Sequence, residues 1–84
     1  MSPSQQICLD GVPVGGLTTV VGVEGGDALA RRLVDLGFWP GTEVEVVRSA
    51  PFGGPVLYRL HGYRLALRRD EAARVQVGAH GSTR

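Results

Sequence analysis

The amino-acid sequence predicts a small, mainly β protein, a barrel of about five short strands with one inserted α-helix at about residues 27–36 and a helical turn at about residues 70–73. The chain has 84 residues, which suffices for one hydrophobic core. Most apolar residues form short runs between Gly and Pro clusters, and one stretch changes to helical spacing. We therefore expect residues 1–84 to form one domain with flexible ends at about residues 1–8 and 78–84.

The first predicted strand leads directly into the predicted helix. Residues 18–23 are rich in β-branched side chains and end at a Glu-Gly-Gly turn cluster. Three leucines then recur at the i, i+4 and i+7 positions of one helix face, after a candidate N-cap and before a candidate C′ glycine. These residues are Leu29, Leu33 and Leu36, with Asp27 as the N-cap and Gly37 as the C′ residue. We expect the apolar face of this helix to pack against the sheet.

The remaining strands follow a predicted tight turn. Pro40 and Gly41 are the pair favoured at the centre of a type II turn, because Pro fixes φ and Gly accepts a positive φ. Residues 42–48 then alternate between apolar and polar side chains, which predicts a half-buried strand. Residues 56–60 and 63–67 flank His61 and Gly62, which predicts a two-residue hairpin. Residues 75–77 form the last strand, and closing these strands into a barrel would remove exposed sheet edges.

The predicted hairpin has one wholly apolar face and one mixed face. The apolar face pairs Leu60 with Tyr63, Tyr58 with Leu65, and Val56 with Leu67. The mixed face pairs Leu57 with Ala66 and Arg59 with Arg64. Because like charges directly opposite each other destabilise a pair of strands, we expect Glu43 or Glu45 on the neighbouring strand to neutralise these arginines.

Composition argues against several classes of protein. A formal charge of +1 is too small to concentrate polyanions by itself. All nine basic residues are Arg, a bias that fits recognition of carboxylates or phosphates but equally fits genome composition. Cys8 is the only cysteine, so no intramolecular disulfide can form. No stretch approaches the roughly 18 apolar residues that span a bilayer, and no signal peptide is apparent, so we expect a cytoplasmic protein.

Patterns that support catalysis or metal binding are weak. The candidates for a nucleophile and a base are Cys8, His61 and His80, but the two histidines are expected at a hairpin tip and in the tail, which orient an imidazole poorly. No spacing typical of paired metal ligands occurs, and the acidic pair at residues 70–71 fits a helix start. A phosphate-binding loop requires a lysine, which is absent. We predict neither catalysis nor a bound cofactor or metal.

Exposed side chains are therefore the candidates for function. Trp39 and Phe52 each lie in a predicted loop framed by Pro and Gly, where aromatic side chains commonly supply binding energy unless they tuck inward and cap the barrel. A groove between these two loops would suit an extended peptide. The mixed face of the hairpin is a second candidate. The predicted partner-binding residues are Trp39, Phe52, Leu57, Arg59 and Arg64.

The order and spacing of these motifs resemble the bacterial ferrous iron transport protein A (FeoA) family from Leu9 to Val77. The lead-in L-D-G-V-P-V-G is similar to the family's opening L-x-x-L-x-x-G. The helix and its exit, which begin at Arg31, are similar to R-R-L-x-x-L-G-[MF]-x-P-G-[ST]. The segments V-V-R-S-A-P-F-G-G-P from Val46 and L-A-L-R-R-D-E-A from Leu65 resemble the family's strand-and-loop signature and its closing segment.

The resemblance implies an SH3-like barrel and a cytoplasmic accessory role in ferrous-iron uptake. The implied partner is the membrane ferrous iron transporter (FeoB), which carries a GTP-binding domain, with no insertion of this chain into the membrane. Direct binding of ferrous ions and formation of a homodimer stay open. A nucleic-acid-binding barrel is the alternative function, because four arginines cluster near one hairpin, namely Arg59, Arg64, Arg68 and Arg69.

Overall fold

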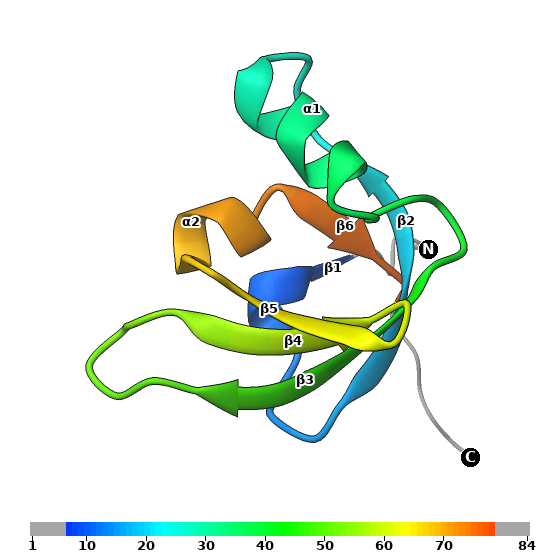
Figure 1. Ribbon diagram of the computed structural model, residues 1–84. Coiled ribbons are helices and arrows are strands. Elements are labelled where there is room, and N and C mark those ends of the chain that lie inside the picture. Colours follow the sequence, from blue (N-terminus) through cyan, green and yellow to red (C-terminus); the bar gives the residue numbers. More distant parts are fainter. Residues whose placement is uncertain (1–6, 79–84) are drawn as a thin grey trace, which may run out of the picture.

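A computed structural model describes residues 7–78, which form one curved antiparallel sheet with two short α-helices and one 3-10 turn (Figure 1). The strand order is β1-β6-β2-β3-β4-β5. The strands are β1 (Ile7–Cys8), β2 (Leu17–Val23), β3 (Glu43–Ser49), β4 (Val56–Leu60), β5 (Tyr63–Leu67) and β6 (Val75–Val77). The helices are the 3-10 turn η1 (Leu9–Gly11), α1 (Ala28–Asp35) and α2 (Arg69–Ala72).

The sheet contains six strands where the sequence predicted about five. The additional strand is β1, in which Ile7 lies opposite Val77 of β6. These two residues fall in the N-terminal end that we expected to be flexible, because a two-residue strand is too short to show an alternating pattern. The rest of the predicted flexible ends, residues 1–6 and 79–84, lies outside the described residues.

The predicted helix is confirmed, and its ends form as the sequence indicates. The Asp27 side chain accepts a hydrogen bond from the Ala30 backbone amide at 3.2 Å, as an N-cap should. Leu33 is buried, and the two other leucines of the predicted face pack against the core. Gly37 follows the helix with a φ of +112°, which favours glycine. The helix lies over β2 at the top of the barrel (Figure 1).

The type II turn after α1 is also confirmed. The Thr42 amide donates to the Trp39 carbonyl at 2.9 Å, with Pro40 and Gly41 between them. Gly41 has a φ of +93°, as the third residue of this turn requires. The turn connects the end of α1 to the start of β3.

The β4–β5 hairpin has the predicted register, from Leu60 opposite Tyr63 to Val56 opposite Leu67. His61 and Gly62 both have positive φ, the pattern of a type I′ turn. The register of β3 against β4 shifts between Val46 and Arg48, which forms a bulge at this point of the strand.

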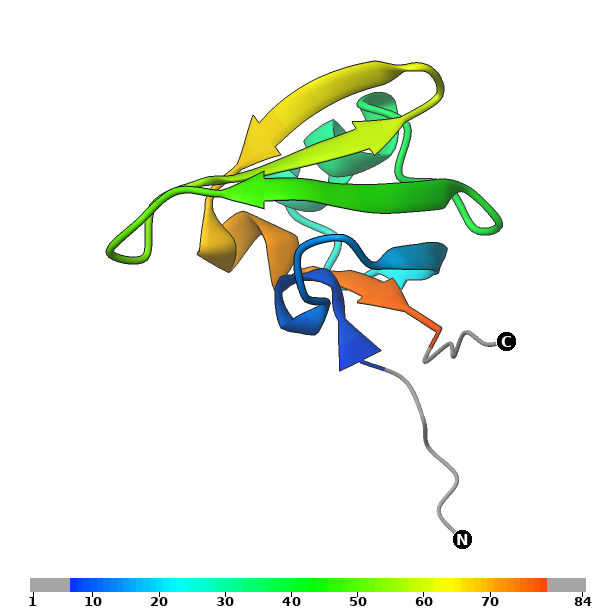
Figure 2. The ribbon, with the colours of Figure 1, turned by 90° about the horizontal axis from the view of Figure 1, so that it is seen from below.

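The core lies between two layers of the curved sheet (Figure 2). Strands β3, β4 and β5 (green to yellow) form one layer, and β1 and β6 (dark blue and orange) lie in the other. Within residues 7–78, no strand pairing joins β5 to β1, so hydrogen bonding does not close the barrel. The helices α2 and η1 contact each other in this gap. The largest fully buried side chains are Tyr58, Phe38, Leu9, Leu33, Leu60 and Leu67.

Candidate docking surfaces

The predicted mixed face of the hairpin exists, and we call it the β4–β5 outer face, formed by Leu57, Arg59, Arg64 and Ala66. Leu57 is half-buried at its centre, and the other three residues are exposed. The guanidinium of Arg59 lies 3.1 Å from the carboxylate of Glu45 on β3, so the expected neutralisation occurs there. Arg64 has no ion-pair partner in the described part of the chain. The face therefore combines a small apolar centre with one uncompensated positive charge.

Trp39 belongs to a cluster at the C-terminal end of α1. Its indole nitrogen donates to the Val34 carbonyl at 2.7 Å, and its ring lies 4.7 Å from the His61 ring. The Tyr63 hydroxyl donates to the Leu36 carbonyl. Trp39 is nonetheless 49% exposed, so it both caps the helix end and presents a face to solvent.

His61 is well oriented, which corrects the expectation from its position at a hairpin tip. Its Nε2 atom lies 2.9 Å from the Gly37 carbonyl. Because a carbonyl oxygen only accepts, Nε2 must carry a proton in this contact. Thr42 donates from its hydroxyl to the same carbonyl at 3.2 Å. The sequence could not reveal this arrangement, because the helix end and the hairpin tip are distant along the chain.

Phe52 lies at the tip of the loop between β3 and β4, and its side chain is fully exposed. It does not tuck inward. Phe52 has a φ of +59° and Gly53 a φ of +76°, with a hydrogen bond from the Gly54 amide to the Pro51 carbonyl at 3.2 Å. This is the pattern of a type I′ turn, which normally selects Asn or Gly at the position that Phe52 occupies.

The Trp39 and Phe52 loops lie at opposite ends of β4, so the predicted groove between them is wrong (Figure 1). The Phe52 loop precedes Val56 at the start of β4, whereas Trp39 packs on His61, which follows Leu60 at its end. A five-residue strand separates its ends by roughly 17 Å. The two aromatic side chains therefore belong to different surfaces.

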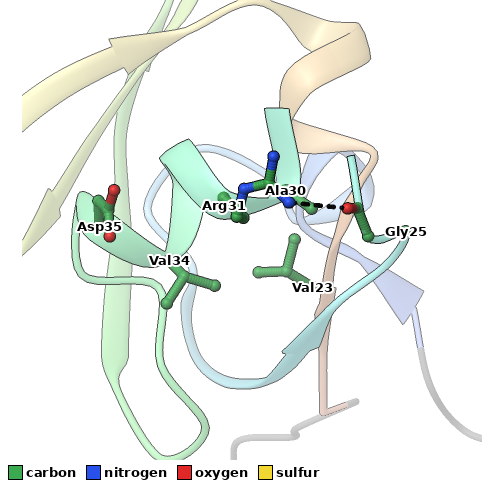
Figure 3. A pocket seen from close by; sticks show the side chains of 7 residues that line it. Val23, Gly25, Ala30, Arg31, Val34 and Asp35 are labelled. Atoms are coloured by element: carbon green, nitrogen blue, oxygen red, sulfur yellow. Dashed lines mark hydrogen bonds between the residues drawn. The ribbon is translucent and has the colours of Figure 1, made fainter. Parts of the chain in front are cut away.

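A hollow of about 250 Å³ lies between α1 and the end of β2 and was not predicted (Figure 3). Val23, Ala30 and Val34 supply apolar lining, with Arg31 and Asp35 along the helix. The Arg31 guanidinium donates to the Gly26 carbonyl at 3.3 Å. The one sequence signal was Val34, an apolar residue that lies off the predicted leucine face of the helix, and in the structure it is 42% exposed. Typical small-molecule sites are larger, at roughly 300–1,000 Å³.

The titratable groups add little reactive chemistry. Burial raises the pKa of the Cys8 thiol, and the nearby carboxylates of Asp10 and Glu24 raise that pKa further, so the thiolate is disfavoured. Among residues 7–78, no group of three or more His, Cys, Asp or Glu side chains is placed to hold a metal ion. None of the helices in this range is long and apolar enough to cross a membrane. His80 lies outside the described residues.

The fold and these surfaces define a small β-barrel domain that presents apolar and basic side chains to solvent. A family model of the FeoA domain matches residues 7–79. The chain belongs to the FeoA family, a family associated with ferrous-iron transport, and the resemblance seen in the sequence motifs is confirmed.

Similar proteins include one fusion and several solved structures. The chain is 38% identical over 63 residues to an Fe(2+) transport protein A/Fe(2+) transporter FeoB fusion protein of Porphyromonas gingivalis, and the match covers 75% of this chain and 8% of the fusion. It is 40% identical to the FeoA of Stenotrophomonas maltophilia, which was solved with zinc and is described as an SH3 domain protein. That match has a TM-score of 0.78 and covers 87% of this chain and 91% of the other.

A third similar protein is the FeoA-like protein of Clostridium acetobutylicum, which is 30% identical. The TM-score is 0.87, and the match covers 98% of this chain and 95% of the other. The SH3 description of the Stenotrophomonas maltophilia FeoA, together with helix α1 between β2 and β3, confirms the predicted SH3-like barrel with an inserted helix.

Proposed function

We propose that this chain is a cytoplasmic accessory protein of bacterial ferrous-iron uptake that binds the cytoplasmic, GTP-binding part of the membrane transporter. The fusion of FeoA with FeoB in the Porphyromonas gingivalis relative carries this proposal. A covalent link raises the effective concentration of two modules for each other, to the order of millimolar when the linker is short and flexible, which favours partners that act on each other. The fusion spans far more than the segment that matches this chain.

The β4–β5 outer face is the surface that we assign to this contact. Leu57 and Ala66 give it an apolar centre, and Arg64 offers a guanidinium without a competing carboxylate in residues 7–78. Arginine forms bidentate hydrogen bonds with carboxylates, so an acidic patch on the transporter domain would complement this face. The ion pair of Arg59 with Glu45 orients its guanidinium on the same face.

The proposal is tested by mixing the full chain with the purified cytoplasmic domain of the transporter, with and without guanine nucleotide, and measuring Kd. We expect Arg64→Glu to weaken binding by at least about tenfold, because charge reversal converts attraction into repulsion. Arg31→Glu makes the same charge change on α1 and serves as the control. Absence of association in every nucleotide state would exclude direct docking.

The other functions have distinct signatures in the same set of experiments. Nucleic-acid binding would appear as retention of mixed RNA that weakens steeply with salt. Direct ferrous binding would appear as a stoichiometric site under anaerobic conditions, and a homodimer would appear in the mass of the free chain in solution. We expect binding to the transporter domain to be observed, and none of these three results to be observed in its place.

A further inference from the structure

The Phe52 loop combines an unfavourable backbone with a fully exposed aromatic side chain. A bulky residue rarely adopts a positive φ, and Phe52 has a φ of +59°. Burial cannot explain its presence, because the side chain is wholly in solvent. Asn or Gly would form the same type I′ turn with less strain. Persistent strain of this kind is a recognised feature of functional positions.

The loop that presents Phe52 is tightly held. The Ala50 amide donates to the Pro55 carbonyl at 2.9 Å, below the turn formed by Pro51 and Gly54. A Cβ atom on Gly54 would lie 2.8 Å from the Ala50 Cβ, so the two sides of the loop are in close approach. The loop backbone is therefore held in the conformation that presents Phe52 to solvent before any partner arrives, which reduces the backbone entropy lost on binding.

Two arginines lie at the same end of the sheet. Arg48 is near the end of β3, opposite Leu57, and Arg68 directly follows Leu67, which lies opposite Val56. Both side chains are exposed, and neither forms an ion pair in the segment 7–78. Because Arg48 lies opposite Leu57, Arg48 extends the β4–β5 outer face toward the end of the sheet from which the Phe52 loop leaves.

We propose that Phe52 is a preformed anchor that inserts into a small apolar pocket of a partner protein, with carboxylates at the pocket rim facing Arg48 and Arg68. This inference rests on the proposed function, because the partner is taken to be the cytoplasmic domain of the transporter. A protein pocket fits better than a lipid surface. One aromatic side chain is a weak membrane anchor by itself. In addition, Asp10 and Asp70 place negative charge close to Arg69 at this end of the sheet, which disfavours binding to an anionic lipid surface.

The decisive variant is Phe52→Asn, which keeps a residue suited to the turn and removes the aromatic ring. We expect its urea midpoint to be equal to or higher than that of the wild type, and its Kd for the transporter domain to rise at least about tenfold. Phe52→Leu should retain most of the affinity. Val21→Asn replaces an exposed apolar side chain on β2, far from the loop, and should leave the Kd unchanged.

The charged rim is tested by Arg48→Gln. We expect weaker binding and a smaller dependence of Kd on salt, because one attractive charge pair is removed. Arg31→Gln removes the same charge from α1 and should change neither property. A salt dependence that is identical in wild type and Arg48→Gln would contradict the acidic rim.

Each other outcome has a definite meaning. A lower urea midpoint for Phe52→Asn would show that Phe52 serves the fold, and would overturn the anchor. Equal affinity of wild type and Phe52→Asn would overturn the anchor and leave docking intact, whereas absence of wild-type binding would overturn both. Binding of the full chain to phosphatidylglycerol vesicles or to mixed RNA that is lost in Phe52→Asn would assign the anchor to lipid or nucleic acid and refute the protein pocket.

Discussion

Gly37 connects the end of α1 to the tip of the β4–β5 hairpin. It has a φ of +112°, and an added Cβ would lie 2.6 Å from Cδ2 and 3.0 Å from Nε2 of His61. Gly37→Ala should therefore strain the backbone, at about 1–3 kcal/mol, and displace the imidazole from the Gly37 carbonyl, at about 1 kcal/mol. We expect the free energy of unfolding to fall by about 2–4 kcal/mol in total.

Gly41→Ala is the matched control. Gly41 has a φ of +93°, but an added Cβ there would meet no atom within 4 Å. Only the backbone strain applies, so Gly37→Ala should be more destabilising than Gly41→Ala by about 1 kcal/mol. Urea unfolding followed by circular dichroism gives both values. The fluorescence of Trp39 should change in Gly37→Ala alone, because its ring packs on His61.

A double-mutant cycle with His61→Asn isolates the contact. Asn tolerates the positive φ of 52° at this position and removes the ring. The double variant Gly37→Ala/His61→Asn should be more stable than the sum of the single effects, by about 1 kcal/mol. Equal destabilisation by the two glycine substitutions, or strict additivity in the cycle, would refute the role that we assign to His61.

Three further predictions concern titration and packing. Hydrogen bonds from Arg74, at 2.7 and 3.0 Å, hold the pKa of the Asp27 carboxyl well below its usual range. Its stabilisation is therefore present above the unfolded pKa and lost in acid, so the advantage of wild type over Asp27→Asn in unfolding free energy should shrink below about pH 4. Burial raises the pKa of Tyr58 to about 12. Because an unfolded tyrosine ionises near pH 10, stability should fall above about pH 10 in the wild type and less so in Tyr58→Phe, as measured by urea unfolding at each pH. Phe38 is fully buried, so Phe38→Ala should cost about 3–5 kcal/mol in a urea titration, a large share of the stability of a small domain.

Local signals in the sequence were sufficient for most elements of the fold. The N-cap at Asp27, the turn at Pro40 and Gly41, and the hairpin tip at His61 and Gly62 each depend on residues within a few positions of one another. Alternation of apolar side chains then determines the register of β4 against β5, because a shift by one residue would turn every core side chain outward. The same alternation predicted which side chains form the β4–β5 outer face.

Surfaces built from distant segments were not predictable in this way. The hollow between α1 and β2 depends on how a helix crosses a strand, and the orientation of His61 depends on a carbonyl located 24 residues away. Strand β1 is recognisable only by its pairing with β6 near the other end of the chain. The full exposure of the Phe52 side chain likewise becomes evident only in the folded loop, which leaves that side chain in solvent.

Residue type and spacing alone thus determined the small β-barrel, its inserted helix, the hairpin register and the membership of the FeoA family. Which loops lie close together was determined by the curvature of the sheet. Trp39 and Phe52 are separated by the length of β4, whereas Trp39 packs against His61. The physical reason is the range of the interactions. Caps, turns and alternation act over a few residues, whereas the position of one loop relative to another depends on twist and packing summed over the whole sheet.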